Sequence, residues 1–120
     1  AMGPELFDRF VAPELAAFSA RYGGLGIHCC ANARHQWDGF ARVPDLLLMN
    51  LSQPEPVVRE AYPRFAAVAP HWHGGWAAGA DPVRWESQLP PRARVVIDVT
   101  AASRDEALAL SDTMVRLTRG

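Results

Sequence analysis

The chain has 120 residues, which suits one domain and is too short for two, so we expect a single domain over residues 1–120. Apolar residues make up 49% of the chain and charged residues 21%, the composition of a soluble globular protein rather than a disordered one. The formal net charge of −1 gives no electrostatic support to a nucleic-acid or anionic-membrane role.

The sequence predicts no targeting or membrane segment. No apolar run approaches the roughly 18 to 20 residues that cross a bilayer, and no basic start precedes an apolar stretch. The two cysteines, Cys29 and Cys30, are adjacent, and adjacent cysteines rarely bridge because the ring that they would close is strained. Free thiols are typical of a reducing compartment, so we expect a cytoplasmic protein. Ala1 and Met2 are interpreted as a vector-derived remnant or a start.

The first part of the chain predicts a helix, a strand and a second helix. Residues 4–21 carry apolar side chains at helical spacing, Pro13 predicts a kink within them, and a glycine pair ends them. Residues 25–29 predict a short strand. Residues 32–42 predict the second helix, with Asn32 as its cap.

The rest of the chain predicts strands that alternate with helices. Residues 46–51 form a continuous apolar run, as expected of a strand buried on both faces. The later elements are a helix over 55–67 that Pro63 interrupts, a strand over 68–73, a loop over 74–91 with a short helix near 82–88, a strand over 94–99, and a final helix that Ser103 and Glu106 begin as a capping box. This order predicts an α/β fold of parallel βα units with three to four strands.

The end of the first predicted strand carries two candidate metal ligands. Residues two apart in a strand share a face, so His28 and Cys30 point the same way and Cys29 points to the other face. Imidazole and thiolate are ligands that suit zinc, and catalytic zinc takes about three protein ligands. The chain has no further cysteine to act as the third. The alternative role for this pair is packing with a hydrogen bond.

Further polar residues lie at the ends of the other predicted strands. His71 and His73 are also two apart, and the alternative for them is a packed surface turn. Asp98, on the last strand, is a candidate oxygen ligand. Asn50 and Ser52 share a face at the end of the second strand, where they are either active-site residues or ordinary turn formers.

One stretch of the sequence, residues 10–52, carries a series of motifs in a fixed order. It runs from a helix with a proline, through a glycine pair and a strand ending His-Cys-Cys-Ala-Asn, to a helix, Val-Pro-Asp-Leu and a second strand. This series resembles the C-terminal half of the uroporphyrinogen decarboxylase superfamily (URO-D-like), whose methyltransferase-type members carry His-Ser-Cys-Gly-Asn or a similar motif at the same point. The resemblance begins near residue 7 and extends more loosely over residues 95–110.

The resemblance implies a (β/α)8 barrel of the TIM type. It implies zinc ligation by His28 and Cys30, in a site that activates a thiol for methyl transfer from a corrinoid, as in the methylcobamide methyltransferases. Asn32 closes the motif and joins the candidate substrate-binding residues. The sequence departs from the family at Ala31, where a glycine is usual, and it lacks the late cysteine that is the family's third ligand. The signature residues for porphyrinogen decarboxylation lie mainly in the half that has no counterpart here.

A complete barrel of this type needs about 250 residues, so this chain corresponds to about half of one. Half a barrel leaves strand edges and an inner face uncovered. We therefore expect a homodimer or larger assembly, or a separate N-terminal half-barrel as partner. The resemblance implies a URO-D-like domain that is part of a zinc-dependent methyltransferase-like or decarboxylase-like enzyme with a small-molecule substrate, and that is incomplete as a catalyst alone. The alternative is a non-catalytic ligand-binding or oligomerisation module derived from a truncated barrel.

Overall fold

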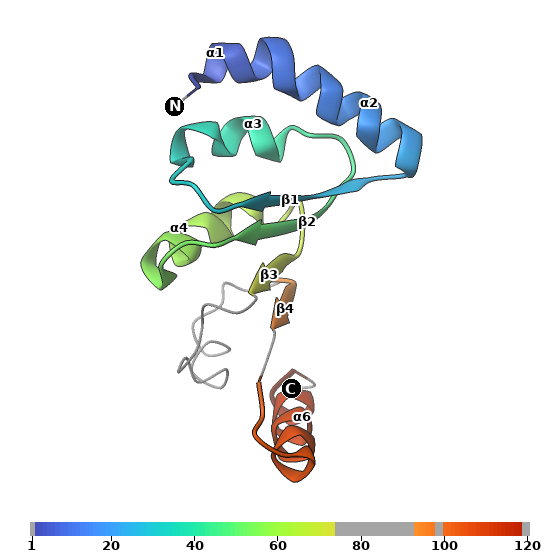
Figure 1. The fold of residues 1–120 in the computed structure, drawn as a ribbon, viewed down its shortest axis with the longest axis vertical. Helices are drawn as coiled ribbons and strands as arrows, with labels where there is room; N and C mark the ends of the chain where they lie inside the picture. The colour runs from blue at the N-terminus through green and yellow to red at the C-terminus, as the bar shows by residue number, and fades with distance from the viewer. Residues whose placement is uncertain (1, 74–92, 98–99, 119–120) are drawn as a thin grey trace.

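Four parallel strands form the sheet around which the other elements are arranged. The computed structural model describes residues 2–73, 93–97 and 100–118. The strands are hydrogen-bonded in the order of the chain and are parallel at every pairing: β1 (Leu25–Cys29), β2 (Leu46–Leu51), β3 (His71–His73) and β4 (Val95–Ile97) (Figure 1). The predicted α/β fold of parallel βα units is confirmed.

A helical segment precedes β1 and changes its winding along its length. α1 (Pro4–Leu6) leads into a π-helical stretch, η1 (Phe7–Val11), and then into α2 (Ala12–Tyr22). Pro13 has no N–H to donate to the preceding turn, and the wider π winding lies directly before it, where the sequence predicts a kink. α2 ends at Gly23, whose φ of 75° is left-handed and whose N–H donates to the Ser19 carbonyl.

The helix after β1 begins later than the sequence predicts. A 3₁₀ turn, η2 (Arg34–Gln36), leads into α3 (Trp37–Ala41). Ala33 is the N-cap residue and no side chain caps the turn, so the prediction that Asn32 caps this helix is wrong. The reason is local, because the Gln36 N–H donates to the Ala33 carbonyl at 2.8 Å and starts the turn beyond Asn32.

The helix after β2, α4 (Glu55–Phe65), passes through Pro63 without a break, so the predicted interruption is wrong. Pro63 lies in the last turn, where its missing N–H removes only one hydrogen bond before the helix ends. Val68 and Ala69 then donate their N–H groups to the Phe65 carbonyl. These two residues therefore remain with the end of the helix, and β3 begins at residue 71 rather than at 68.

The last helix, α6 (Arg104–Thr118), begins as the sequence predicts. The Ser103 hydroxyl accepts the Glu106 N–H at 3.2 Å, and the Glu106 carboxylate accepts the Ala102 N–H at 2.7 Å. This pair of bonds is a capping box whose return bond reaches one residue beyond the N-cap. The predicted short helix at 82–88 and the end of the predicted strand at 98–99 lie outside the described residues.

Helices α3 and α4 cover one face of the sheet (Figure 1), which we call the helix face. Its central row, one residue from each strand, is Ile27, Met49, His71 and Val95. Aromatic rings above this row pack edge to face, with Trp37 6.1 Å from Phe65 between centroids and Phe7 5.4 Å from Phe40. The core of the described chain lies between this face and the helices.

The opposite face is not covered by the described helices, and we call it the open face. Its described residues alternate with those of the helix face and are Gly26, His28, Leu48, Asn50, Trp72 and Val96. Val96 is 49% exposed. Within β2, Asn50 on this face is 7% exposed and Leu48 is half-buried, so the prediction that β2 is buried on both faces is confirmed in part.

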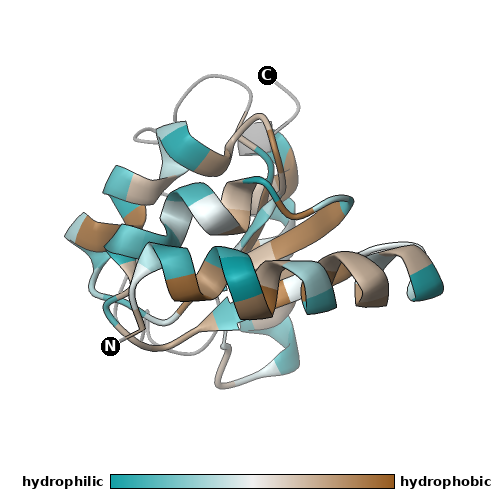
Figure 2. Ribbon diagram, turned by 90° about the horizontal axis from the view of Figure 1, so that it is seen from above, coloured by the Kyte–Doolittle hydropathy of each residue, from teal (hydrophilic) through white to brown (hydrophobic). Residues whose placement is uncertain are grey.

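We expect Phe65→Ala to lower the free energy of unfolding by about 3–5 kcal/mol, since it empties a packed site in the core. Phe65 is 0% exposed, whereas Phe18, on α2, is 55% exposed. One end of α2 extends past the other elements in Figure 2. The matched control, Phe18→Ala, should change the free energy of unfolding by about 0.5 kcal/mol or less. Urea denaturation at fixed protein concentration measures both, and equal losses would contradict this packing.

Candidate functional site

A shift in strand register brings two sequence-predicted site residues together. Leu25 pairs with Leu46, but the next residue of β1 pairs with Leu48, so Leu47 is an extra residue in β2. From that point onward His28 lies opposite Asn50. Both residues belong to the open face near the carboxyl ends of their strands.

Asn50 links three neighbouring strands through its side chain. Its amide nitrogen donates to the backbone carbonyl of Trp72 on β3 at 2.7 Å. Its amide oxygen is in hydrogen-bond contact with Nδ1 of His28 on β1. Asn50 is 7% exposed, whereas His28 is exposed. The buried amide therefore anchors an imidazole whose other side faces away from the sheet.

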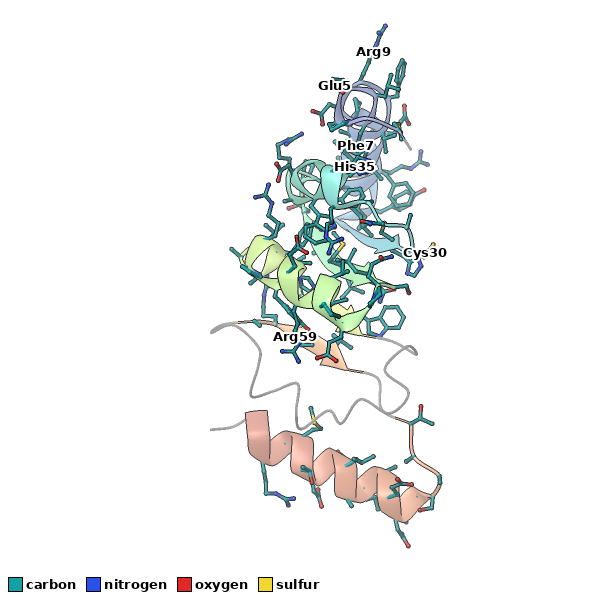
Figure 3. All side chains as sticks on the ribbon, turned by 90° about the vertical axis from the view of Figure 1, so that its left-hand side faces the viewer. Glu5, Phe7, Arg9, Cys30, His35 and Arg59 are labelled. Carbon is teal, nitrogen blue, oxygen red and sulfur yellow. The ribbon has the colours of Figure 1, made fainter. Side chains whose placement is uncertain are left out.

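The segments that follow β1 and β2 are joined at the same edge. The Ser52 N–H donates to the Cys29 carbonyl at 3.0 Å, and the Gln53 side chain donates to the Cys30 carbonyl at 2.8 Å. Cys30 is exposed. In Figure 3, which looks toward the carboxyl ends of β1 and β2, Cys30 lies on the side of the sheet away from α4. This edge of the sheet thus presents His28 and Cys30, which are two residues apart in the chain.

Cys29 belongs to the other side of the strand. It is half-buried and packs against the core, as the alternation of a strand requires. Its thiol donates to the Ala31 carbonyl at 3.4 Å. This difference in environment makes Cys29 a matched control for experiments on Cys30.

The remaining predicted site residues lie at several different places. Ser52 is half-buried at the same edge as Asn50, and Asn32 is exposed in the turn beyond Cys30. His73 is the last residue of β3 and pairs with Ile97 of β4. Asp98 lies outside the described residues.

His71 lies on the helix face, on the opposite side of the sheet from His28. It is 1% exposed, and its ring centroid lies 4.6 Å from that of Tyr62 and 5.7 Å from that of Phe65. The structure therefore brings His28, Cys30, Asn50 and Ser52 to one edge and places His71 in the core.

The donor set at this edge is small for a metal. No cluster of three or more His, Cys, Asp or Glu side chains occurs within residues 2–73, 93–97 and 100–118 in an arrangement that could hold a metal ion. His28 and Cys30 are donors that zinc accepts, but catalytic zinc takes about three protein ligands. A zinc site here would need one more donor from outside the described residues.

Sequence reasoning missed the part that Trp72 plays. A strand over 68–73 predicts that Trp72 lies on the opposite face from His71 and His73. It does not predict whether Trp72 or the two histidines face the helices. The signal lies in the polar Asn50 within an apolar run, because a buried amide needs partners on the adjacent strands. The Trp72 carbonyl is that partner on β3.

No family model, no curated protein and no solved structure matches this chain. Among the described helices, none is long and apolar enough to cross a membrane.

We expect stability to fall with pH above about 10 because of Tyr62. Burial raises the pKa of Tyr62 above its ordinary value, against the opposing effect of the Arg59 charge. The unfolded phenol loses its proton near pH 10 while the folded one keeps it. The stabilisation is therefore complete below pH 10 and is lost as the pH rises, by up to about 1.4 kcal/mol per pH unit.

Denaturation of Tyr62→Phe between pH 9 and 11.5, a range that brackets the ordinary tyrosine pKa of about 10, tests this expectation. The variant should lose much of the alkaline dependence. Tyr22, which is exposed on α2, supplies the control, and Tyr22→Phe should keep the dependence of the unchanged protein. The same alkaline slope in all three proteins would show that Tyr62 does not cause it.

Proposed function

We propose that this chain is about half of a (β/α)8 barrel enzyme of the URO-D-like superfamily, with a zinc-dependent site for a small-molecule thiol. The observation that carries the proposal is the pair His28 and Cys30 on the open side of the sheet, at the carboxyl end of β1. In barrel enzymes the chemistry occurs at the carboxyl ends of the strands. Methyl transfer and the corrinoid methyl donor rest on the resemblance in sequence.

The topology supports a barrel more than an open doubly wound sheet. The strand order β1-β2-β3-β4 follows the chain, with every pairing parallel. Doubly wound sheets reverse their strand order at a switch point and carry helices on both faces. Here α3 and α4 both lie on the helix face (Figure 1), as helices do around the outside of a barrel.

Exposed side chains on the open face support a partner there. Trp72 on β3 is 37% exposed and Val96 on β4 is 49% exposed, and both belong to this face. Large apolar side chains that neighbour one another at the surface are typical of an interaction site. A second copy, or a separate half-barrel, would supply the strands that cover the open face.

Zinc would bind through Nε2 of His28 and Sγ of Cys30, with a further donor from the covering half. Bound zinc lowers the pKa of a coordinated thiol and so supplies a thiolate nucleophile at neutral pH. The residues of this chain would hold and orient that group. Asn32 and Ser52, which lie at the same edge, would contact the substrate.

We expect purified protein to contain a stoichiometric amount of zinc. The variants His28→Ala and Cys30→Ser should lose this zinc. Elemental analysis after size-exclusion chromatography in chelator-free buffer makes the measurement. Cys29→Ser should retain the metal, because Cys29 packs against the core on the helix side. Unchanged protein without zinc, or zinc retained in both site variants, would exclude this proposal and favour a non-catalytic module.

We expect the chain to have a mass in solution of at least twice its 13.1 kDa. Light scattering at micromolar concentration measures this mass. Val96→Arg, which places a charge on the open face at β4, should shift the protein toward the monomer. Phe18→Arg, at a similarly exposed position on α2, should not. A monodisperse monomer for the unchanged chain would contradict self-association and leave a separate half-barrel as the partner.

A further inference from the structure

We infer that Asn50 is a positioning residue that fixes His28 in the tautomer protonated at Nδ1, so that Nε2 offers a lone pair on the open face. The site would then take an electron-pair acceptor, either a metal cation or an N–H or O–H donor, and not an anion. The inference deepens the proposed function by naming the class of ligand, and only the choice of zinc as the test ligand rests on that function.

The orientation of the Asn50 amide follows from its partner on β3. The Trp72 backbone oxygen is a carbonyl, which can only accept a hydrogen bond. The group that lies 2.7 Å from it must therefore be the amide nitrogen of Asn50. The opposite orientation would bring two acceptor oxygens together at a residue that is 7% exposed, where water cannot easily separate them. The amide oxygen consequently faces β1.

The tautomer of His28 follows from that orientation. An amide oxygen only accepts, so the Nδ1 atom that contacts it must carry the hydrogen. A neutral imidazole has one N–H, and Nε2 is then unprotonated. Since His28 itself is exposed, this nitrogen is accessible from the open face.

The same arrangement determines what the imidazole can bind. Metal-binding histidines commonly donate the other ring N–H to an oxygen, which fixes the ring and the tautomer. Here the donation goes to a side chain that is itself held by the next strand, so rotation of the ring would break the chain of bonds from β1 to β3. A polar group that must accept a hydrogen bond finds no donor at Nε2.

Two-bond ¹H–¹⁵N correlation spectra of the histidine rings test the tautomer directly. The sample is metal-free protein, dialysed against a chelator, at a pH well above the ordinary imidazole pKa of about 6.5. We expect His28 to show the pattern of Nδ1 protonation. Asn50→Leu should give a mixture or the Nε2-protonated form. Asn50→Asp keeps an acceptor for Nδ1 and should keep the Nδ1 pattern, but it should also lower stability, because its second oxygen faces the Trp72 carbonyl in place of the amide N–H.

Two controls separate positioning from general structural damage. Ser52→Ala lies at the same edge without a described bond to the ring and should leave the pattern unchanged. The ring signals of His71, which lies in the core beside Tyr62, report whether each variant remains folded. If Asn50→Leu does not fold, the ring pattern in the unchanged protein and in Asn50→Asp still shows which nitrogen of His28 carries the hydrogen.

Zinc titration gives the second readout. Asn50→Leu should bind zinc about ten- to a hundred-fold more weakly, with rescue in Asn50→Asp. An Nε2-protonated His28 in the unchanged protein, or a folded Asn50→Leu variant that keeps the Nδ1 pattern, would overturn the inference. Protein that shows the Nδ1 pattern but binds no zinc would overturn the proposed function and leave the tautomer established.

Discussion

The extra residue at Leu47 determines which side chains meet across the first two strands. Without it each residue of β1 would pair one position earlier on β2, and His28 would lie beside Met49 instead of Asn50. Gly24 makes room for this bulge, since a Cβ there would lie 2.5 Å from Leu47 Cδ1. Its φ of 118° is also one that side chains rarely allow. The polar contact at the open face thus depends on a glycine at the start of β1.

The alternation of side chains along each strand divides the sheet into two chemical environments. Met49 and His71 lie under α4 with apolar and aromatic neighbours, and the row beside them carries His28, Asn50 and Trp72. Burial of the first row supplies the hydrophobic stabilisation that holds β2 and β3 in place. That stability in turn allows a buried amide to span three strands, because its partners are held by the sheet and not by a loop.

One-sided packing connects the fold to the proposed partner. Helix α6 lies beyond β4, apart from α3 and α4 in Figure 1, and its Leu108 side chain is 50% exposed. The open face and this helix both present apolar surface that a further set of strands would cover. We propose that a covering half would contact the sheet at the candidate site. The same partner would then complete both the fold and the site.

The sequence alone determined where the first two strands lie. Gly and Pro delimit residues 25–29 and 46–51, and the structure has β1 and β2 with those bounds. The capping box at Ser103 and Glu106 likewise predicted the start of α6, because it depends on residues that are close together in the sequence. The sequence also singled out His28 and Cys30 by their spacing on one face of a strand, and Asn50 by its place at the end of the next strand. These features depend on neighbours in the chain.

Only the tertiary structure decided which face each side chain occupies. A strand predicts that His71 and Trp72 point in opposite directions, but the packing of α4 placed His71 in the core and Trp72 on the open face. The pairing of His28 with Asn50 depends on a one-residue shift between strands that are separated by a helix. Such contacts depend on sheet register, which local propensities do not specify.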